Sequence, residues 1–347
     1  MSNVLNMNVK RLAILLAVAS CLFAADPIFL QRQVQNVQPK PDDLTAASAK
    51  AASYKPLFGI GDQDVDQLKG VARYGELTVG PGGTTAMVSY PAEEQIYFVE
   101  EGSGTLLYGD EKAPIKANDF MYLPVGVKHG VANSSSAPVR VLVMGYKIPA
   151  DMKVQPTPKL MLANTDDVRF QDLGQHGPTS HYKLMMGTTS SQRDKLPAAY
   201  VMGSLFIMDF EPGGTNIPHN HPAEEEIYFL LRGSGDMVAG LDANGKEVRY
   251  PVTPGAAFLF KPGTEVGYYS NSKGQPHDLM LAARSRVPGM SMRGPGGGRG
   301  PEGRGSPGSR PGRQQWALTM VVAAGVSRDF LSPRSQGSTP STGWAAP

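Results

Sequence analysis

An internal repeat constrains the fold of this chain more than any other feature of its sequence. The tetrapeptide PGGT at 81–84 returns at 212–215, which is 131 residues further along the chain. The apolar run IYF at 96–98 returns at 227–229 with the same offset. A repeat of this length corresponds to a complete domain, so we expect two domains of the same architecture.

Each copy of the repeat consists of short apolar or alternating runs separated by turn-forming residues. Examples are the runs at 120–123, 139–144 and 205–210. The chain contains 40 Gly and 29 Pro, which favour many turns and oppose long helices. Short strands joined by frequent turns are typical of antiparallel barrels and double-sheet jelly rolls, so the sequence predicts an all-β fold.

Three residues of the second copy have the chemistry of metal ligands. His219 and His221 are separated by one residue, so in a strand both imidazoles point to the same face. Glu226 follows at the start of a new apolar run. Two imidazoles and one carboxylate on neighbouring strands can hold a divalent transition metal and leave further positions open. The alternative is a surface hairpin with two histidines and an acidic turn.

The spacing of this segment, from Gly213 through the two histidines and Glu226 to Gly233, resembles the first conserved motif of the cupin superfamily. The resemblance implies two tandem antiparallel jelly-roll barrels, in agreement with the strand pattern. It also implies one divalent transition metal, held by His219, His221 and Glu226. Mixed nitrogen and oxygen donors suit Mn, Fe, Ni, Co or Zn, and the sequence does not choose among them.

The two copies divide the ligand set of this family between them. In the first copy, Val88, Tyr90 and Gln95 stand at the three ligand positions, while His129 stands where the family has its fourth ligand. In the second copy, Val266 replaces that fourth histidine. We therefore expect a metal-free first barrel in which His129 is a satisfied structural residue. The second barrel should hold a three-ligand site, although a decaying site would leave the same residues.

Other polar residues of the second copy are assigned by strand alternation. Tyr268 lies two residues beyond position 266, so it should face inward and could contact a bound cofactor or substrate. Glu265 should face outward, and Glu224 and Glu225 are expected on an exposed turn. Three further histidines are expected to be solvated or at the surface: His176, His181 and His277.

The N-terminal residues resemble an export signal. Lys10 and Arg11 precede an apolar run at 12–23 that is too short for a comfortable membrane span. The string VASC ends at Cys21 and resembles a lipoprotein cleavage box, which would make Cys21 a lipid anchor; ordinary cleavage a few residues later is the alternative. We expect an exported protein that is periplasmic, lipid-anchored or extracellular. Cys21 is the only cysteine, so no intramolecular disulfide can form.

These observations predict the organisation of the whole chain. The expected parts are an export signal at 1–25, a polar spacer at 26–53, a first barrel with most metal ligands lost at 54–150, an inter-barrel segment at 151–179, a second barrel with the metal site at 180–287, and a disordered Gly/Arg/Pro-rich tail at 288–347. The net charge is only +2, and the excess of arginine lies in the tail. The folded part therefore offers no basic surface for nucleic acid.

The resemblance implies a metal-dependent enzyme of the dioxygenase, decarboxylase or isomerase type that acts on a small oxygenated organic molecule. Two alternatives stay open: a non-catalytic protein that binds a small molecule or sugar, and a structural protein with a vestigial metal site. The sequence contains no Gly-x-Ser-x-Gly nucleophile elbow and no Cys–His arrangement. Self-association into a homo-oligomer is also expected to be feasible for two such barrels.

Overall fold

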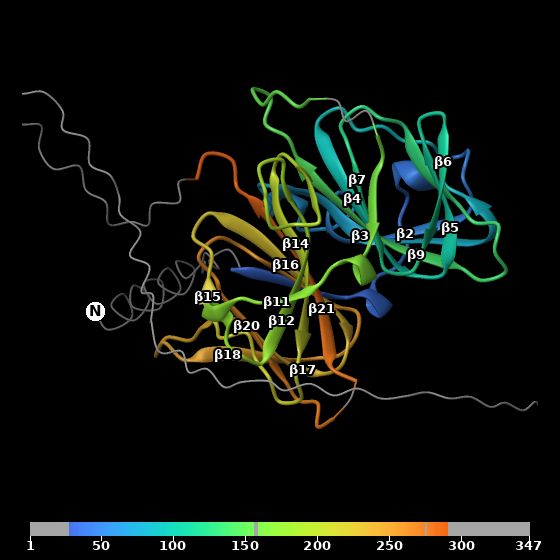
Figure 1. Cartoon of the computed structure of the whole chain (residues 1–347). Helices are drawn as coiled ribbons and strands as arrows, with labels where there is room; N and C mark the ends of the chain where they lie inside the picture. The colour runs from blue at the N-terminus through green and yellow to red at the C-terminus, as the bar shows by residue number, and fades with distance from the viewer. Residues whose placement is uncertain (1–27, 156–158, 275, 291–347) are drawn as a thin grey trace, which may run out of the picture. The chain divides into compact units, whose positions relative to one another are not determined.

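The computed structural model describes residues 28–155, 159–274 and 276–290 (Figure 1). Strands dominate these residues, and the helices among them are short 3-10 turns. The prediction of an all-β fold is therefore confirmed. The expected export signal at 1–25 and most of the expected tail at 288–347 lie outside the described residues. Within the described ranges, no helix is long and apolar enough to cross a membrane.

The first copy of the repeat forms one nine-stranded sheet with the order β10-β7-β4-β9-β3-β8-β5-β6, in which β2 also pairs with β3. Its strands are β2 (Lys50–Gly59), β3 (Val71–Thr84), β4 (Glu93–Glu101), β5 (Ser103–Tyr108), β6 (Glu111–Lys116), β7 (Asp119–Leu123), β8 (His129–Ala132), β9 (Val139–Lys147) and β10 (Met161–Asn164). Strand β3 pairs with β9 and, at Thr84, with β8. The sheet thus curls around a core that includes Tyr97, Leu106 and Val141.

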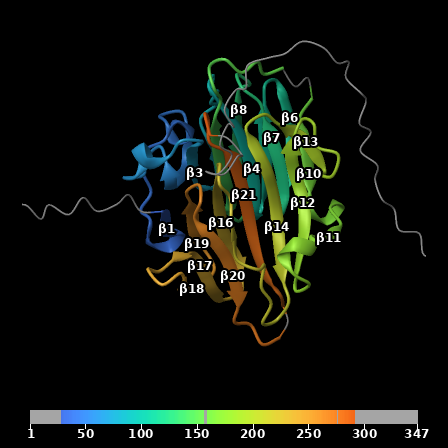
Figure 2. The same cartoon turned by 90° about the vertical axis from the view of Figure 1, so that its left-hand side faces the viewer.

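The second copy forms two sheets that pack face to face. The first has the order β1-β19-β16-β21-β14-β12-β11, with β13 beside β12, and Figure 2 shows this order across the view. Its strands are β1 (Phe29–Gln33), β11 (Phe170–Asp172), β12 (Ser180–Thr188), β13 (Leu196–Ala199), β14 (Met202–Phe210), β16 (Glu224–Arg232), β19 (Ala256–Phe260) and β21 (Asp278–Arg286). The second has the order β15-β20-β17-β18: β15 (His219–Asn220), β17 (Gly235–Leu241), β18 (Glu247–Val252) and β20 (Glu265–Ser270). Side chains of both sheets, including Phe206, Phe258 and Met237, share one core.

The N-terminal segment differs from the expected polar spacer at 26–53. It contributes strand β1, which pairs with β19 of the second barrel along its whole length. Leu30 and Val34 are buried, and the ring of Phe29 lies 5.9 Å from that of Phe258. These few apolar residues stand among polar ones, so the sequence shows no alternation over a run long enough to predict a strand.

Two buried glutamates join the barrels reciprocally. Glu94 accepts hydrogen bonds from the backbone N–H groups of residues 200, 201 and 202 at 2.7, 3.0 and 2.6 Å. Glu225 accepts hydrogen bonds from the backbone N–H groups of residues 69, 70 and 71 at 2.7, 2.8 and 2.9 Å. Both the carboxylates and the loops are related by the 131-residue offset of the repeat. Glu225 was expected on an exposed turn, but it is only 1% exposed, because this loop of the first barrel covers it.

A hydrophobic core also crosses the boundary between the barrels. Residues of both copies belong to it, and the ring of Tyr74 in β3 lies 6.5 Å from that of Phe229 in β16. The inter-barrel segment is shared in the same way, because β10 pairs with β7 of the first barrel and β11 pairs with β12 of the second. The two barrels therefore form one packed body over the described residues up to 290.

Candidate metal centre

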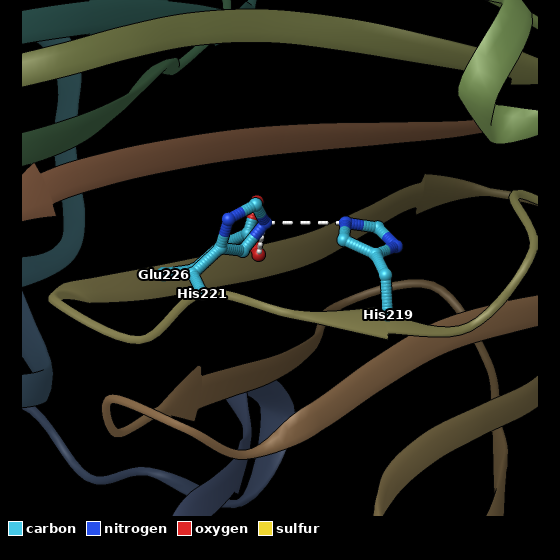
Figure 3. A group of neighbouring side chains, drawn as sticks. All are labelled: His219, His221 and Glu226. Carbon is cyan, nitrogen blue, oxygen red and sulfur yellow. Dashed lines mark hydrogen bonds and ion pairs between the residues drawn. The ribbon is translucent and has the colours of Figure 1, made fainter. Parts of the chain in front are cut away.

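The structure brings His219, His221 and Glu226 together in the second barrel (Figure 3). The Nε2 atoms of the two histidines are 3.1 Å apart, and Nε2 of His221 lies 3.3 Å from Oε2 of Glu226. All three potential ligand atoms lie within 4.8 Å of one another. Two donors about 2.1 Å from one ion, at roughly a right angle, are about 3 Å apart. The observed spacing therefore fits three ligands on one face of a single ion.

A hydrogen bond orients the imidazole of His219 toward this point, and a carboxylate lies beside the imidazole of His221. Nδ1 of His219 lies 3.0 Å from the carbonyl oxygen of Ile217 and donates its proton there, which leaves the lone pair of Nε2 facing the site. Nδ1 of His221 lies 3.4 Å from Oε2 of Glu224. A metal on Nε2 requires a proton on Nδ1, and Glu224 is placed to accept it. Glu224 was expected on an exposed turn; strand β16 instead begins at this residue and holds it beside His221.

Glu226 provides a second test of the metal hypothesis. Its side chain is 2% exposed, and Oε2 is buried without a hydrogen bond from any described residue. A buried carboxylate oxygen without a partner is costly, and a bound cation removes that cost. The nearest guanidinium, that of Arg284, lies 3.8 Å away and faces the other oxygen, Oε1. The residues at this site therefore fit a divalent metal ion.

Arg284 is a site residue that the sequence did not reveal. It lies on β21, whose register places it directly opposite Glu226. Met280 and Ala282 precede it on the same face and are buried, so alternation along this strand would have indicated an inward-facing arginine. Its Nη1 lies 3.6 Å from Glu224, while its Nε is buried without a hydrogen bond within the described part of the chain.

A cavity of about 340 Å³ opens beside the three donors. Arg284 and Tyr182 contribute polar groups to its wall, and Leu184, Phe206 and Met208 make part of the wall apolar. Burial raises the pKa of Tyr182 to about 12, so its hydroxyl group remains protonated at neutral pH. A cavity of this size, lined by both polar and apolar side chains, is suited to a small molecule.

His176 also lines this cavity, although it was expected to be solvated. It ends the 3-10 turn η5 (Gly174–His176), and its ring centroid lies 4.8 Å from that of His219. Burial, together with the nearby His219 and Arg284, lowers the pKa of His176 to about 4, so the ring is neutral at pH 7. The other two histidines lie outside the cavity wall: His181 contacts Asp172 and Glu211, and His277 pairs with Asp209.

Tyr268, for which the sequence suggested contact with a bound cofactor or substrate, is not among the described residues that line this cavity. Its side chain does face inward, as alternation predicted, and is fully buried. However, its hydroxyl group donates a hydrogen bond to Asp278 at 2.8 Å, and its ring packs 4.8 Å from that of Phe210. In β20, Val266 is the residue that pairs with His219. Tyr268 lies two residues further along, beyond the described residues that line the cavity.

The equivalent position in the first barrel is closed. His129 pairs with Val88 in the first barrel, and the equivalent pair in the second barrel is Val266 with His219. The ring of His129 contacts the rings of Tyr90 and Tyr97. Its Nδ1 donates to the carbonyl oxygen of residue 127 at 3.0 Å, but its Nε2 has no partner among the described residues. His129 is therefore only half satisfied.

Side chains fill the space next to His129. Arg73 lies over the ring of Tyr90 at 4.1 Å and pairs with Asp42 and Glu93, each at 3.0 Å. Leu44, which follows in the 3-10 turn η2 (Asp43–Thr45), is fully buried in the core of the first barrel. This arrangement supports a structural role for the first barrel.

The fold and the site define a double-barrel cupin. The Cupin domain family matches the chain at 75–145 and again at 206–281. Germin-like protein 1-3 of Oryza sativa subsp. japonica is 31% identical over 153 residues, which are 43% of this chain and 67% of that protein. Germin-like protein subfamily 2 member 3 of Arabidopsis thaliana is 29% identical over 154 residues, which are 44% of this chain and 65% of that protein. The chain belongs to the cupin superfamily and contains two cupin domains.

Solved structures show the same two-barrel fold. Protein Ylba from E. coli superposes with a TM-score of 0.57 at 12% identity, covering 79% of this chain and 98% of that one. Oxalate decarboxylase of Bacillus subtilis superposes with a TM-score of 0.54 at 11% identity, covering 74% of this chain and 77% of that one. At such low identity these likenesses concern the fold alone. The matches to the germin-like proteins cover about half to two thirds of those proteins.

Proposed function

We propose that this bicupin is an exported enzyme that binds one divalent transition metal in its second barrel and acts on a small carboxylic acid. The observation that carries the proposal is the convergence of His219, His221 and Glu226 beside a cavity, with donor spacings that suit one ion. The bound metal would supply a Lewis acid that polarises an oxygen atom of the substrate. Mn(II) is the first ion to test, because a related fold, the oxalate decarboxylase of Bacillus subtilis, contains Mn(II) centres.

The substrate class follows from Arg284 and from a comparison of the two barrels. Register places Arg284 opposite Ser204 and Glu226, and it places Gly145 opposite Arg73 and Gln95. These paired residues occupy equivalent positions in the two repeats, and each set contains one guanidinium group. In the first barrel that guanidinium, on Arg73, holds the carboxylate of Asp42 at 3.0 Å. Arg284 lines the cavity and has looser contacts, because its Nη1 lies 3.3 Å from Nδ1 of His221 and 3.6 Å from Oε2 of Glu224. A substrate carboxylate in the cavity would give this guanidinium a closer anionic partner.

The remaining wall of the cavity supports binding rather than proton transfer. Tyr182 stays protonated and can donate a hydrogen bond to a substrate oxygen. Phe206 and Met208 exclude water from the apolar part of the cavity, which strengthens the attraction between Arg284 and an anion. Arg284 would thus orient the substrate beside the residues that would hold the metal, and the metal would supply the Lewis acid for the reaction.

Elemental analysis of the purified chain tests the metal site. We expect close to one transition-metal ion per chain, and loss of that ion in a His219→Ala/His221→Ala double variant. A His181→Ala/His277→Ala double variant is the matched control, because both histidines lie outside the cavity wall in the described structure. Absence of metal from the wild-type chain, even after refolding with Mn, Fe, Zn or Ni, would refute the proposal.

Turnover by the metal-loaded chain tests the enzymatic part. Small mono- and dicarboxylic acids are supplied, and uptake of dioxygen and release of carbon dioxide separate a dioxygenase from a decarboxylase. An Arg284→Gln variant should keep its metal but bind the acid about 10- to 100-fold more weakly, because a charge-assisted hydrogen bond is lost. A metal-loaded chain that binds an acid without converting it would instead be a non-catalytic binding protein.

Export is proposed from the N-terminal sequence, since Lys10, Arg11 and the run at 12–23 lie outside the described residues. Fractionation of bacterial cells that express the whole chain should recover it outside the cytoplasm. A chain that begins at residue 26 should remain in the cytoplasm. Labelling with a radioactive fatty acid, which a Cys21→Ser variant should abolish, separates the lipid-anchored form from the soluble one.

A further inference from the structure

We infer that His176, which belongs to the segment between the barrels, is a further nitrogen ligand of the metal. The inference rests on the proposed metal site and adds a residue from outside the repeated motifs. His176 comes from η5, far in sequence from His219 and Glu226, yet it lines the same cavity.

The ring of His176 lies next to that of His219, one of the three candidate ligands. Its centroid lies 4.8 Å from the centroid of His219, at an interplanar angle of 71°. The centroids of His219 and His221 are 4.9 Å apart, at 90°. Two imidazoles whose nitrogens lie about 2.1 Å from one ion, at roughly a right angle, have centroids about 5 Å apart. The ring of His176 therefore lies as close to that of His219 as the ring of His221 does. Its nitrogens lie outside the set of donor atoms that are within 4.8 Å of one another, so binding requires the His176 ring to turn toward the other three residues.

An unsatisfied nitrogen indicates that His176 has a ligand to bind. Nδ1 of His176 is shielded from solvent and forms no hydrogen bond with any residue that the structure describes. Oε2 of Glu226 is in the same condition, so two buried donors of one cavity both lack a partner. Buried polar atoms are almost always paired in folded proteins, so both atoms are expected to have a partner that the described residues do not supply.

Neighbouring residues hold His176 in place. Its backbone N–H group donates to the carbonyl oxygen of Leu173 at 2.8 Å, and its own carbonyl oxygen accepts from the hydroxyl of Ser180 at 3.2 Å. The imidazole also packs against Tyr182, with 5.2 Å between the centroids. A ring that is fixed on both sides loses little conformational freedom when it binds an ion.

The inference also explains how the second barrel can do without a histidine at position 266. In the first barrel, His129 lies across from Val88, whereas the second barrel has Val266 across from His219. His176 supplies a nitrogen to the same cavity from a different element. The second barrel would then bind its metal through three histidines and one glutamate.

Metal titration of the purified whole chain tests this inference. The apo proteins are titrated with Co(II) and followed by visible absorption, and pulsed EPR of the Cu(II)-loaded forms counts the coordinated imidazoles. His176→Ala should bind Co(II) about 10- to 100-fold more weakly than the wild-type chain and lose one imidazole from the count. His176→Gln, which is closer in size to histidine, should behave in the same way if the nitrogen is what the site needs.

His181→Ala is the matched control, because His181 is five residues away and contacts Asp172 and Glu211 outside the cavity. It should leave the affinity and the imidazole count unchanged. Thermal unfolding of the apo forms checks that each variant folds. If the wild-type chain binds metal and His176→Ala matches its affinity and imidazole count, the inference is wrong and the proposed function stands. If the wild-type chain binds no metal, both are wrong.

Discussion

At the scale of single residues, His129 shows what happens to a ligand-type histidine in a closed barrel. Its side chain is 1% exposed, and burial lowers its pKa to about 4 from an ordinary value of 6.5. Between these two values the unfolded chain binds a proton that the folded chain does not. The free energy of unfolding must therefore fall as the pH decreases through this window, and His129 imposes no such penalty above pH 6.5.

We predict that His129→Leu flattens this pH dependence. The free energy of unfolding, measured with urea, should fall between pH 7 and pH 5 by about 2 kcal/mol more in the wild-type chain than in the variant. His176, whose pKa is lowered in the same direction, will leave part of the dependence in place. His181→Ala should not flatten the curve, because carboxylates raise the pKa of His181. If the free energy of unfolding depended on pH equally in His129→Leu and in the wild-type chain, this account would be wrong.

At the scale of structural elements, the parts that the sequence predicts are those defined by local pattern. Strands such as β7 and β14 contain short apolar runs bounded by turn residues. His219, His221 and Glu226 lie within one motif whose strand geometry brings them together. Arg284 and His176 reach the cavity only through long-range packing, by the pairing of β21 with β16 and the placement of η5. Alternation along β21 indicates that Arg284 faces inward, but no local pattern indicates which cavity Arg284 reaches or that His176 lines the same cavity. Strand β1 escaped prediction for a similar reason, since its partner lies more than 200 residues away.

The reciprocal glutamates offer a prediction at the same scale. Glu225 precedes the metal-ligand candidate Glu226, and three backbone N–H groups of the first barrel hold its carboxylate. Glu225→Gln removes the charge and one acceptor oxygen, so we expect unfolding free energy to drop by about 2–3 kcal/mol. Because Glu226 shares the same stretch of backbone, metal affinity should also weaken by about 10-fold.

The repeat provides the control for this variant. Glu94 makes the equivalent hydrogen bonds to residues 200–202, but the residue that follows it is Gln95 and not a ligand candidate. Glu94→Gln should therefore lose similar stability in urea unfolding while its metal titration matches that of the wild-type chain. If both variants lost metal affinity equally, the effect would come from general destabilisation and not from the placement of Glu226.

At the scale of the whole molecule, the two barrels have different tasks. Asp42 and Leu44 fill the first barrel, and its loop at 69–71 holds Glu225 of the second. The second barrel keeps the cavity and the candidate ligands. A core that includes Tyr74 and Phe229 joins them, so the first barrel supports the site without containing one.

The N-terminal strand extends this dependence to the start of the described chain. Strand β1 pairs with one edge of β19, and β16 pairs with the other edge. Strand β16 carries Glu226, which lies opposite Phe260 of β19. A chain that begins at residue 40 loses β1 together with the buried Leu30 and Val34. It should therefore lose roughly 3–5 kcal/mol of unfolding free energy relative to a chain that begins at residue 28.

Removal of β1 also leaves the edge of β19 without a partner, and unpaired edges promote association between chains. We expect size-exclusion chromatography to show aggregates of the shorter chain, and hydrogen exchange to speed up first in β19 and then in β16. Metal affinity should fall with the protection of β16, because Glu226 is held by that strand. Equal stability, exchange and metal affinity in the two chains would mean that β1 only covers the barrel and that the site depends on the repeated domains alone.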